Sequence, residues 1–443
     1  MAGPHVSREL LRAVARGELP PKVLVDLVFR HVMEECPHCR LEYDAFRRTR
    51  IVAEDYSVPL QKAFSQLSEK RETVLQQRAE AELWLAELRL LEPAPRKRKV
   101  QRARNRYRGR VFAERLIAAS IDALPGAPRE SLSWAECAYA VLYKGRVPQE
   151  DAACAVRALA WMANAHRALG ELPRAEELVG MARDWLSRWG AEQGPALADL
   201  DRVEGALRKD CQRLEEAEQL LSKAALQYQV LGDEVSLAAC LLTLGIVYNR
   251  AGDAVAAVDA TRRALEKIDR QEQPKLYIFG RYNLAFYLLG QGQLDAAAAV
   301  LESDAEVFAG VTDDYMGPRF KLLRAKLAAE RGDFRSSEAG LVAARDQFAR
   351  VGIGYDVANV NLELALLYLR QGKLELVKST VADAVLLFES QMVHRNALAA
   401  LILMREAAFA EELTAAMIHS AQSFLLKVFS AGPHAHDAGG LPF

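Results

Sequence analysis

The residues with the clearest potential for chemistry lie near the start of the chain, where His31 is followed by Cys36 and Cys39. Imidazole and thiolate groups are preferred ligands of zinc, and a Cys-x-x-Cys pair commonly forms half of a tetrahedral site. These three side chains come within reach of one Zn²⁺ ion. The sequence therefore indicates a zinc site, with the alternative that the three residues close a small knot of helices without a metal.

Three short helices must position these side chains. Capping and proline signals predict helices over Arg8–Ala15, over Pro21–Glu34 and from Pro37 onward. An offset of five residues on a single helix would point His31 and Cys36 about 140° apart. The second helix must therefore end before the first cysteine, which the proline that follows favours.

The segment resembles the small zinc-binding anti-sigma fold, because Cys36, Cys39 and the basic Arg40 match its signature. One extra residue separates the histidine from the first cysteine. The resemblance implies a fourth ligand further upstream, which would be His5, with His38 as the substitute. A site with three or four protein ligands has no open position, so its zinc would be structural and not catalytic. The resemblance also implies a sigma factor as the partner of this domain.

The next segment predicts one long helix from Tyr56 to Leu91, because it contains almost no helix-breaking residues. We expect its apolar side to consist of Leu60, Phe64, Leu67, Leu75, Leu83 and Leu88. Such a helix packs on a neighbouring array or forms a short coiled coil. The alternative is a connecting helix that wraps a sigma factor.

The strongest local charge follows this helix, where nine of fifteen residues are basic. The nine are Arg96, Lys97, Arg98, Lys99, Arg102, Arg104, Arg106, Arg108 and Arg110. A run of this kind is usually a solvated, self-repelling linker. The alternative is a surface that binds phosphates or an acidic partner, with Tyr107 among the cations and an affinity that falls with salt. We expect no contact with nucleic acid outside this segment.

The rest of the chain is organised by a repeat. Six turn positions recur at intervals of 42, 40, 40, 40 and 40 residues, within sequence that otherwise predicts helix. They are Gly170, Gln212, Gly252, Gly292, Gly332 and Gly372. A fixed period of this length is typical of a stacked array of helix pairs.

Residue size also recurs around each turn. Seven residues before it stand Ala163, Gly205, Gly245, Ala285, Ala325 and Ala365. The positions five and twelve residues after it are mostly alanine, and sixteen after it stand Leu186, Tyr228, Ile268, Phe308, Phe348 and Phe388. An antiparallel helix pair packs with small residues where the helices cross and a large apolar residue at the far end.

This pattern resembles the tetratricopeptide repeat, as the spacing of Ala285, Gly292 and Ala297 illustrates. The resemblance covers Ala152–Met392, and a seventh, degenerate unit without the turn glycine is expected over His394–Val428. It implies an all-α fold, a right-handed α-solenoid of helix-turn-helix repeats. The long period implies longer helices than the commonest members have, as in bacterial regulatory and kinesin-light-chain-like members.

These observations divide the chain into five parts. They are a small helical, zinc-finger-like domain (1–55), the long helix and basic linker (56–110), capping helices (111–151), an array of about seven repeats (152–429) and a disordered tail (430–443). The net charge of -1 gives no general argument for nucleic acid or a membrane surface. No apolar run is long enough to span a bilayer, and the first residues lack the apolar core of a signal peptide. We expect a cytoplasmic protein whose Cys137, Cys154, Cys211 and Cys240 are reduced core residues.

The array offers a groove for binding. By the register of the repeat, the residues ten, six, three and two before each turn residue face the groove. The candidate contacts are Asn164, Arg167, Leu242, Ile246, Asn249, Arg250, Tyr282, Phe286 and Arg370, together with Leu322 and Leu362. Asparagine and arginine bond the backbone and carboxylates of an extended peptide, and the apolar positions provide pockets.

The sequence contains no catalytic motif: there is no phosphate-binding glycine loop, no metalloprotease motif and no nucleophile elbow. Helical arrays rarely assemble an active site, so we expect a binding protein and not an enzyme. The first hypothesis is a scaffold or regulatory subunit that holds a partner protein or peptide in the groove. The alternatives are an anti-sigma-type regulator and a sensor of a peptide or small ligand.

Overall fold

The structure of the chain is a computed structural model that describes residues 6–16, 36–51, 57–103, 106–143, 147–189, 194–303, 316–351, 354–390, 402, 404–409 and 412–430. These residues form α-helices and one 3₁₀ turn without any strand, which confirms the all-α prediction. The chain divides into two compact units, Met1–Ala79 and Glu80–Phe443. None of the helices in the described ranges is both long and apolar enough to cross a membrane.

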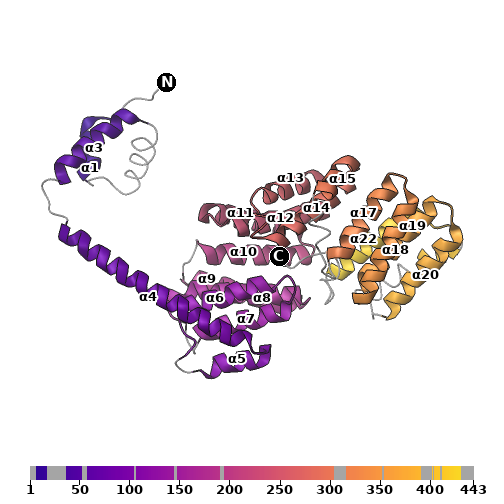
Figure 1. Cartoon of the computed structure of the whole chain (residues 1–443), viewed down its shortest axis with the longest axis horizontal. Coiled ribbons are helices and arrows are strands. Elements are labelled where there is room, and N and C mark those ends of the chain that lie inside the picture. Colours follow the sequence, from indigo (N-terminus) through magenta and orange to yellow (C-terminus); the bar gives the residue numbers. More distant parts are fainter. Residues whose placement is uncertain are drawn as a thin grey trace. The chain divides into compact units, whose positions relative to one another are not determined.

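The first unit contains α1 (Arg8–Arg16) and α3 (Pro37–Ile51), where the sequence predicts them, and the first part of α4 (Ser57–Arg89) (Figure 1). Leu11 of α1 packs against both cysteines of the predicted zinc site, at the start of α3. The helix predicted over Pro21–Glu34 lies outside the described residues. The core of this unit therefore includes the predicted thiol ligands.

Helix α4 (Ser57–Arg89) is the long helix that the sequence predicts, but its leucines do not form one apolar side. In the second unit, Leu85 and Leu88 are buried in a core with the helices that follow, whereas Leu83 is 71% exposed. Two residues advance a helix by about 200°, so positions 83 and 85 lie on nearly opposite sides. The prediction of a single apolar side through Leu83 and Leu88 is wrong.

The first part of the basic segment is a packed helix and not a solvated linker. Residues Pro93–Arg102 form α5, which packs against α7 (Pro128–Leu142). The buried guanidinium of Arg96 lies 3.6 Å from the centre of the Trp134 ring and donates a hydrogen bond to a carboxylate oxygen of Glu130 (2.6 Å). These contacts hold α5 in place, because moving the helix would break the stacking on Trp134 and the hydrogen bond to Glu130.

Four other cations of this segment are also paired. The pairs are Lys97 with Glu136 (2.6 Å), Lys99 and Arg106 with Glu87 (2.5 Å each) and Arg110 with Glu114 (2.7 Å). Arg98, Arg102 and Arg108 are exposed, and Arg104 lies outside the described residues. Tyr107 is buried against the rings of Trp84 and Phe112. The expectation that this tyrosine helps the cations to bind phosphate is therefore wrong.

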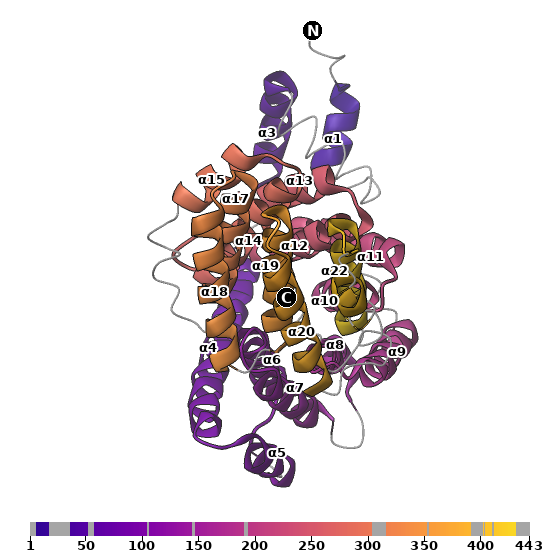
Figure 2. The ribbon, with the colours of Figure 1, turned by 90° about the vertical axis from the view of Figure 1, so that its right-hand side faces the viewer.

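After α6 (Arg110–Ala123) and α7, six helix pairs follow one another along the chain, in the order that Figure 1 shows. The pairs are α8 (Ala152–Ala168) with α9 (Leu172–Trp189), α10 (Pro195–Asp210) with α11 (Leu214–Leu231), α12 (Glu234–Ala251) with α13 (Ala254–Leu265), α14 (Pro274–Gly290) with α15 (Leu294–Ser303), α17 (Met316–Glu330) with α18 (Phe334–Val351), and α19 (Gly354–Arg370) with α20 (Leu374–Ser390). Figure 2 shows α17 to α20 side by side. Helix α22 (Ala415–Ser430) belongs to the predicted seventh unit, and the predicted tail after it lies outside the described residues.

Every predicted turn residue has the backbone conformation of a tight turn. The angle φ lies between 70° and 88° at the five glycines and is 60° at Gln212. This left-handed region is open to glycine, which has no Cβ atom, and costs free energy for other residues. The period is therefore maintained at Gln212 even without glycine.

The small residues before each turn lie where the helices of a pair cross, as predicted. A Cβ atom on Gly205 would lie 2.7 Å from Cγ of Leu221, and one on Gly245 would lie 2.7 Å from Oγ1 of Thr261. Both distances are too short for ordinary contact. The far-end residues whose side chains are described are buried, namely Leu186, Tyr228, Ile268 and Phe348.

Three of the four cysteines in the capping helices and the array are core residues, as predicted. Cys137, Cys154 and Cys240 are buried, and burial raises the pKa of each thiol to about 12. They are therefore protonated and unreactive at neutral pH. Cys211 is only half-buried, because it follows the last residue of α10 at the edge of the core.

Candidate functional site

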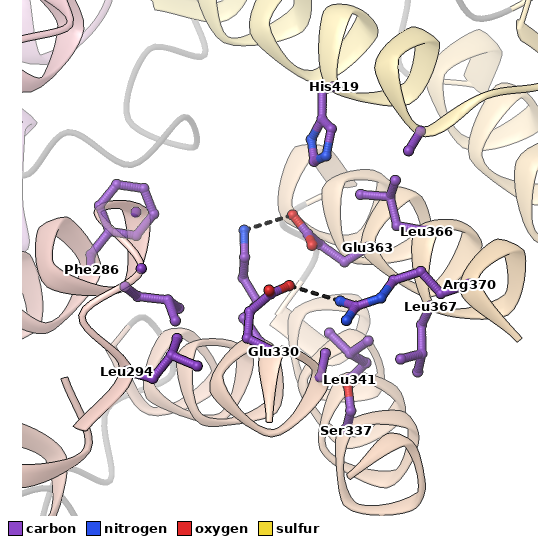
Figure 3. Close-up of a pocket in the computed structure, with 16 residues that line it drawn as sticks. Phe286, Leu294, Glu330, Ser337, Leu341, Glu363, Leu366, Leu367, Arg370 and His419 are labelled. Carbon is purple, nitrogen blue, oxygen red and sulfur yellow. Dashed lines mark hydrogen bonds and ion pairs between the residues drawn. The ribbon is translucent and has the colours of Figure 1, made fainter. Parts of the chain in front are cut away.

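We call the residues ten, six, three and two before each turn residue the groove face. In three successive pairs, the position six before the turn holds Phe286 of α14, Lys326 of α17 and Leu366 of α19. All three line one cavity of about 480 Å³, which we call the groove cavity (Figure 3). The period of the sequence thus brings equivalent positions from three pairs to one site.

The groove cavity has two apolar sides. Phe286 and Leu294 come from the pair α14 and α15, and Figure 3 shows them facing Leu341, Leu366 and Leu367 across the cavity. The ring of Phe286 is 37% exposed, although it is a large apolar side chain. Partly exposed aromatic rings at a concave site are the usual anchors for a partner's apolar side chains.

Two ion pairs cross the same cavity. Nζ of Lys326 lies 2.8 Å from Oε1 of Glu363, and Nη1 of Arg370 lies 2.7 Å from Oε1 of Glu330 (Figure 3). Each pair joins α17 to α19. Because these charges are partly exposed, a ligand can replace one partner of each pair at small cost.

Helix α22 contributes to the groove cavity from the C-terminal end of the chain. Ala415 and His419 line it, and Figure 3 shows the imidazole of His419 on the side of Glu363. The amide of Gln422 donates a hydrogen bond of 2.9 Å to Oε1 of Glu363, and Ile418 is buried. The cavity is therefore bounded by α22 as well as by the groove face.

The groove face of the first three pairs is closed by charged residues, which we call the ion cluster. Asp210 of α10 accepts a hydrogen bond from Nη1 of Arg167 of α8 (2.5 Å) and lies 3.0 Å from Nζ of Lys209. Arg250 of α12 is 4.0 Å from the same carboxylate, and Arg167 also bonds Asn164 (2.7 Å). Arg167 is only 4% exposed, and Asn164 is buried as well. The prediction that these two side chains contact a ligand is wrong, because Asp210 and its neighbours enclose them.

The ion cluster alters the proton affinities of its members. Burial lowers the pKa of Lys209 to about 8, because a buried ammonium loses its hydration. Burial by itself would raise the pKa of Asp210, but Lys209, Arg167 and Arg250 outweigh it and hold that pKa far below its ordinary value. The cluster thus contains one carboxylate that stays ionised and one lysine that loses its proton at mildly basic pH.

The remaining predicted contacts fall into two groups. Leu242, Leu322 and Leu362 are buried in the core, so their assignment to the groove is wrong. The position ten before the turn points between the helices wherever leucine occupies it. Ile246, Asn249 and Arg250 are half-buried, and Tyr282 stacks on Phe286 with ring centres 6.3 Å apart. Tyr282 thereby supports the aromatic wall of the groove cavity.

The predicted zinc ligands are described only in part. Cys36 and Cys39 are buried together at the start of α3, and burial raises the pKa of Cys39. Within the described ranges, no three histidine, cysteine, aspartate or glutamate side chains gather as a metal site would require. His5 and His31 lie outside those ranges.

Several cavity residues were missed by the sequence analysis. Lys326 and Leu366 occupy the same register position as Phe286, and Glu330 occupies that of Arg370, so all three could have been found by applying the register to every pair. His419 carries no such signal. Its unit lacks the turn glycine, so the repeat gives no register there.

No family model and no curated protein matches the chain. Solved structures with similar folds include the apo form of RapI, which is 12% identical in sequence and has a TM-score of 0.53. The match covers 71% of this chain and 86% of the RapI chain. A Rap protein complexed with competence and sporulation factor is also 12% identical over the same shares, with a TM-score of 0.56. These likenesses agree with an α-solenoid of tetratricopeptide-like helix pairs and show the fold alone.

Proposed function

We propose that this chain is a non-enzymatic scaffold or regulatory subunit that binds a segment of a partner protein, or a peptide, in the groove cavity. One observation carries the proposal. Three successive pairs present the same register position to a single cavity, through Phe286, Lys326 and Leu366. A repeated set of contacts along one face suits an extended chain, whose side chains also recur at regular intervals.

The chemistry of the groove cavity indicates the kind of segment that would fit. An apolar side chain of the partner would lie between Phe286 and Leu341, where both walls are apolar. Charged groups beside it would exchange with the ion pairs of Lys326 and Arg370. A volume of about 480 Å³ accommodates a few side chains and not a folded domain.

The comparison with solved structures supports binding by this fold. A Rap protein of similar fold was solved as a complex with competence and sporulation factor. A sensor of a peptide or small ligand would use the same groove cavity. A sigma factor stays one candidate for the partner, on the resemblance of Cys36, Cys39 and Arg40 alone.

The test begins with capture of partners by the tagged full-length chain and their identification by mass spectrometry. The affinity of the purified partner is then measured for the Phe286→Ala variant. We expect a loss of at least tenfold, because the change removes the aromatic anchor of the cavity. The control is Phe409→Ala, which removes an exposed ring outside the cavity. Equal affinity of Phe286→Ala and the unmodified chain would contradict the proposal.

We also propose one structural zinc ion in the first unit, bound by Cys36 and Cys39. The two thiols interact with each other at the start of a helix, beside Leu11, which suits half of a tetrahedral site. Metal analysis of the full chain should give about one zinc ion, and none after Cys36→Ser with Cys39→Ser. The control is Cys211→Ser, and a zinc-free unmodified chain would end this idea.

A further inference from the structure

A second cavity, of about 600 Å³, lies between α5, α7, α8 and α9. We call it the α5–α7 cavity. Lys97 and Gln101 line it from α5, Tyr139 from α7, Tyr143 from the position directly after α7, and Arg174 from α9. It shares no lining residue with the groove cavity, so the function proposed above leaves it without a role.

An aromatic stack forms one wall of the α5–α7 cavity. Tyr143 directly follows α7, and its backbone N–H donates a hydrogen bond to the backbone oxygen of Tyr139 (2.8 Å), so the two residues lie one turn apart at the end of the helix. Their ring centres are 5.4 Å apart with an angle of 12° between the planes, and Tyr139 also contacts Trp185, 6.1 Å away. Tyr143 ends the stack and is 45% exposed. The stack can therefore continue onto a planar ring from outside.

Uncompensated positive charge stands beside this wall. Helix α5 has five basic residues and no acidic one. Arg96, Lys97 and Lys99 have carboxylate partners, whereas no carboxylate within the described part of the chain forms an ion pair with Arg98 or Arg102. These two arginines are exposed and four residues apart, so they lie one turn from each other on the helix. Neither lines the cavity itself, but each directly follows a residue that does, so the two arginines stand on the surface of α5 beside the cavity.

The position of α5 is fixed before any ligand binds. Arg96 is stacked over Trp134 and bonded to Glu130, and its Nε donates to the backbone oxygen of Leu88 (3.1 Å). Val100, one turn further along, is buried in the same core. Because its inner side is held in this way, the helix presents its outer cations without a backbone ordering cost on binding.

We propose that the α5–α7 cavity binds a nucleotide, either free or as part of a single strand. The base stacks on the open face of Tyr143, and the phosphate lies against Arg98 and Arg102. Gln101, between them on α5, reaches polar groups of the base or sugar. A stacking ring combined with neighbouring cations is how proteins bind single-stranded nucleic acid without a sequence preference. An acidic peptide would use the cations but not the ring stack, which is why a nucleotide fits better.

The test measures binding of a fluorescent single-stranded oligonucleotide to the full chain by anisotropy at several salt concentrations. Tyr143→Ala should weaken binding about tenfold through the loss of one stacked base. Arg98→Gln with Arg102→Gln should reduce the slope of log affinity against log salt by about 1.4, since each phosphate contact on a single strand contributes about 0.7. The control is Arg262→Gln with Arg263→Gln, which removes the same charge from exposed positions on α13.

Competition distinguishes the two sources of the ligand. If a nucleoside monophosphate displaces the oligonucleotide at a similar concentration, the site takes free nucleotides, and if only a longer strand competes, it takes single strands. Either result supports the proposal. Three results would overturn it: no saturable binding of either ligand, full binding by Tyr143→Ala, or equal competition by a poly-glutamate peptide.

Discussion

The same register positions produce two different surfaces in the two halves of the array. In the first three pairs, the positions three and two before the turn include Arg167, Lys209, Asp210 and Arg250, which close on one another as the ion cluster. In the last three pairs, equivalent positions line the open groove cavity. The repeat thus determines where side chains meet, and the residue types decide whether the space is filled by buried charges or left open to a ligand.

The largest expected effect is a loss of stability in the first three pairs, where the ion cluster closes the groove face. Asp210→Ala would leave Arg167, Lys209 and Arg250 without their shared carboxylate, and an uncompensated buried charge costs about 3–5 kcal/mol. Glu330→Ala is the matched change in the last three pairs, which line the open groove cavity. Its exposed ion pair with Arg370 should contribute less than about 1 kcal/mol to stability. Urea unfolding of both variants measures the difference. Equal losses would mean that the two halves do not differ in this respect.

The second prediction concerns pH. Burial lowers the pKa of Lys209 from 10.5 to about 8, so between these values the unfolded chain binds more protons at this site than the folded chain. This site's contribution to stability therefore rises with pH from about 8 to 10.5, by a total on the order of 3 kcal/mol. Lys209→Met removes the titrating group and keeps the side-chain length.

The measurement is the free energy of unfolding of the unmodified chain minus that of Lys209→Met, across this pH range. Taking the difference cancels the opposite trend of the buried cysteines, whose unfolded thiols titrate near pH 9. We expect the difference to increase with pH. A flat difference would show that Lys209 keeps its ordinary pKa and that the ion cluster is less enclosed.

The third prediction concerns a larger side chain placed in the groove cavity. Ala329 lines the groove cavity three residues before its turn, and Ala329→Leu places a larger side chain there. Stability should change by less than about 1.5 kcal/mol, since the residue is not fully enclosed. Affinity for the captured partner should fall about tenfold. Unchanged affinity, measured by titration, would place the partner elsewhere on the chain.

The smallest expected effect concerns the turns. Gln212 has φ of 60°, whereas the corresponding residue of the pair α17 and α18 is Gly332. Gln212→Gly should raise the free energy of unfolding by about 0.5–1 kcal/mol, because glycine adopts the left-handed conformation without strain. The melting temperature should rise slightly as a result. Gly332→Gln should lose a similar amount. If Gln212→Gly is destabilising, a contact of the glutamine side chain contributes more to stability than the left-handed backbone conformation costs.

The sequence was sufficient for the fold because its signal is local. Gly252 and Gly245 lie within one helix pair, and the period repeats their relationship in the others. The same reasoning failed for Arg167, since its partner Asp210 is 43 residues away and only the stacked array brings them together. It failed for Arg96 for the same reason, because a run of cations does not reveal a buried tryptophan on α7.

The candidate site was predicted in part. Phe286 and Arg370, which the register assigns to the groove face, line the groove cavity. The contribution of α22 could not be foreseen, because His419 and Gln422 belong to a unit without a turn glycine. Their approach to Glu363 depends on the path of the chain after the last regular pair.

The ion cluster also bears on how the array would come apart. Asp210 links α8, α10 and α12, so three pairs share one buried electrostatic centre. Loss of any one of them exposes charges in the other two, which makes these pairs a single cooperative folding unit. From α14 onward, the ion pairs at the groove cavity are partly exposed, and the buried pair of Arg319 with Asp356 (2.7 Å) joins only α17 to α19. Under heat or mechanical force we expect this end of the array to open first, so that partner binding there is lost while the first three pairs are still folded.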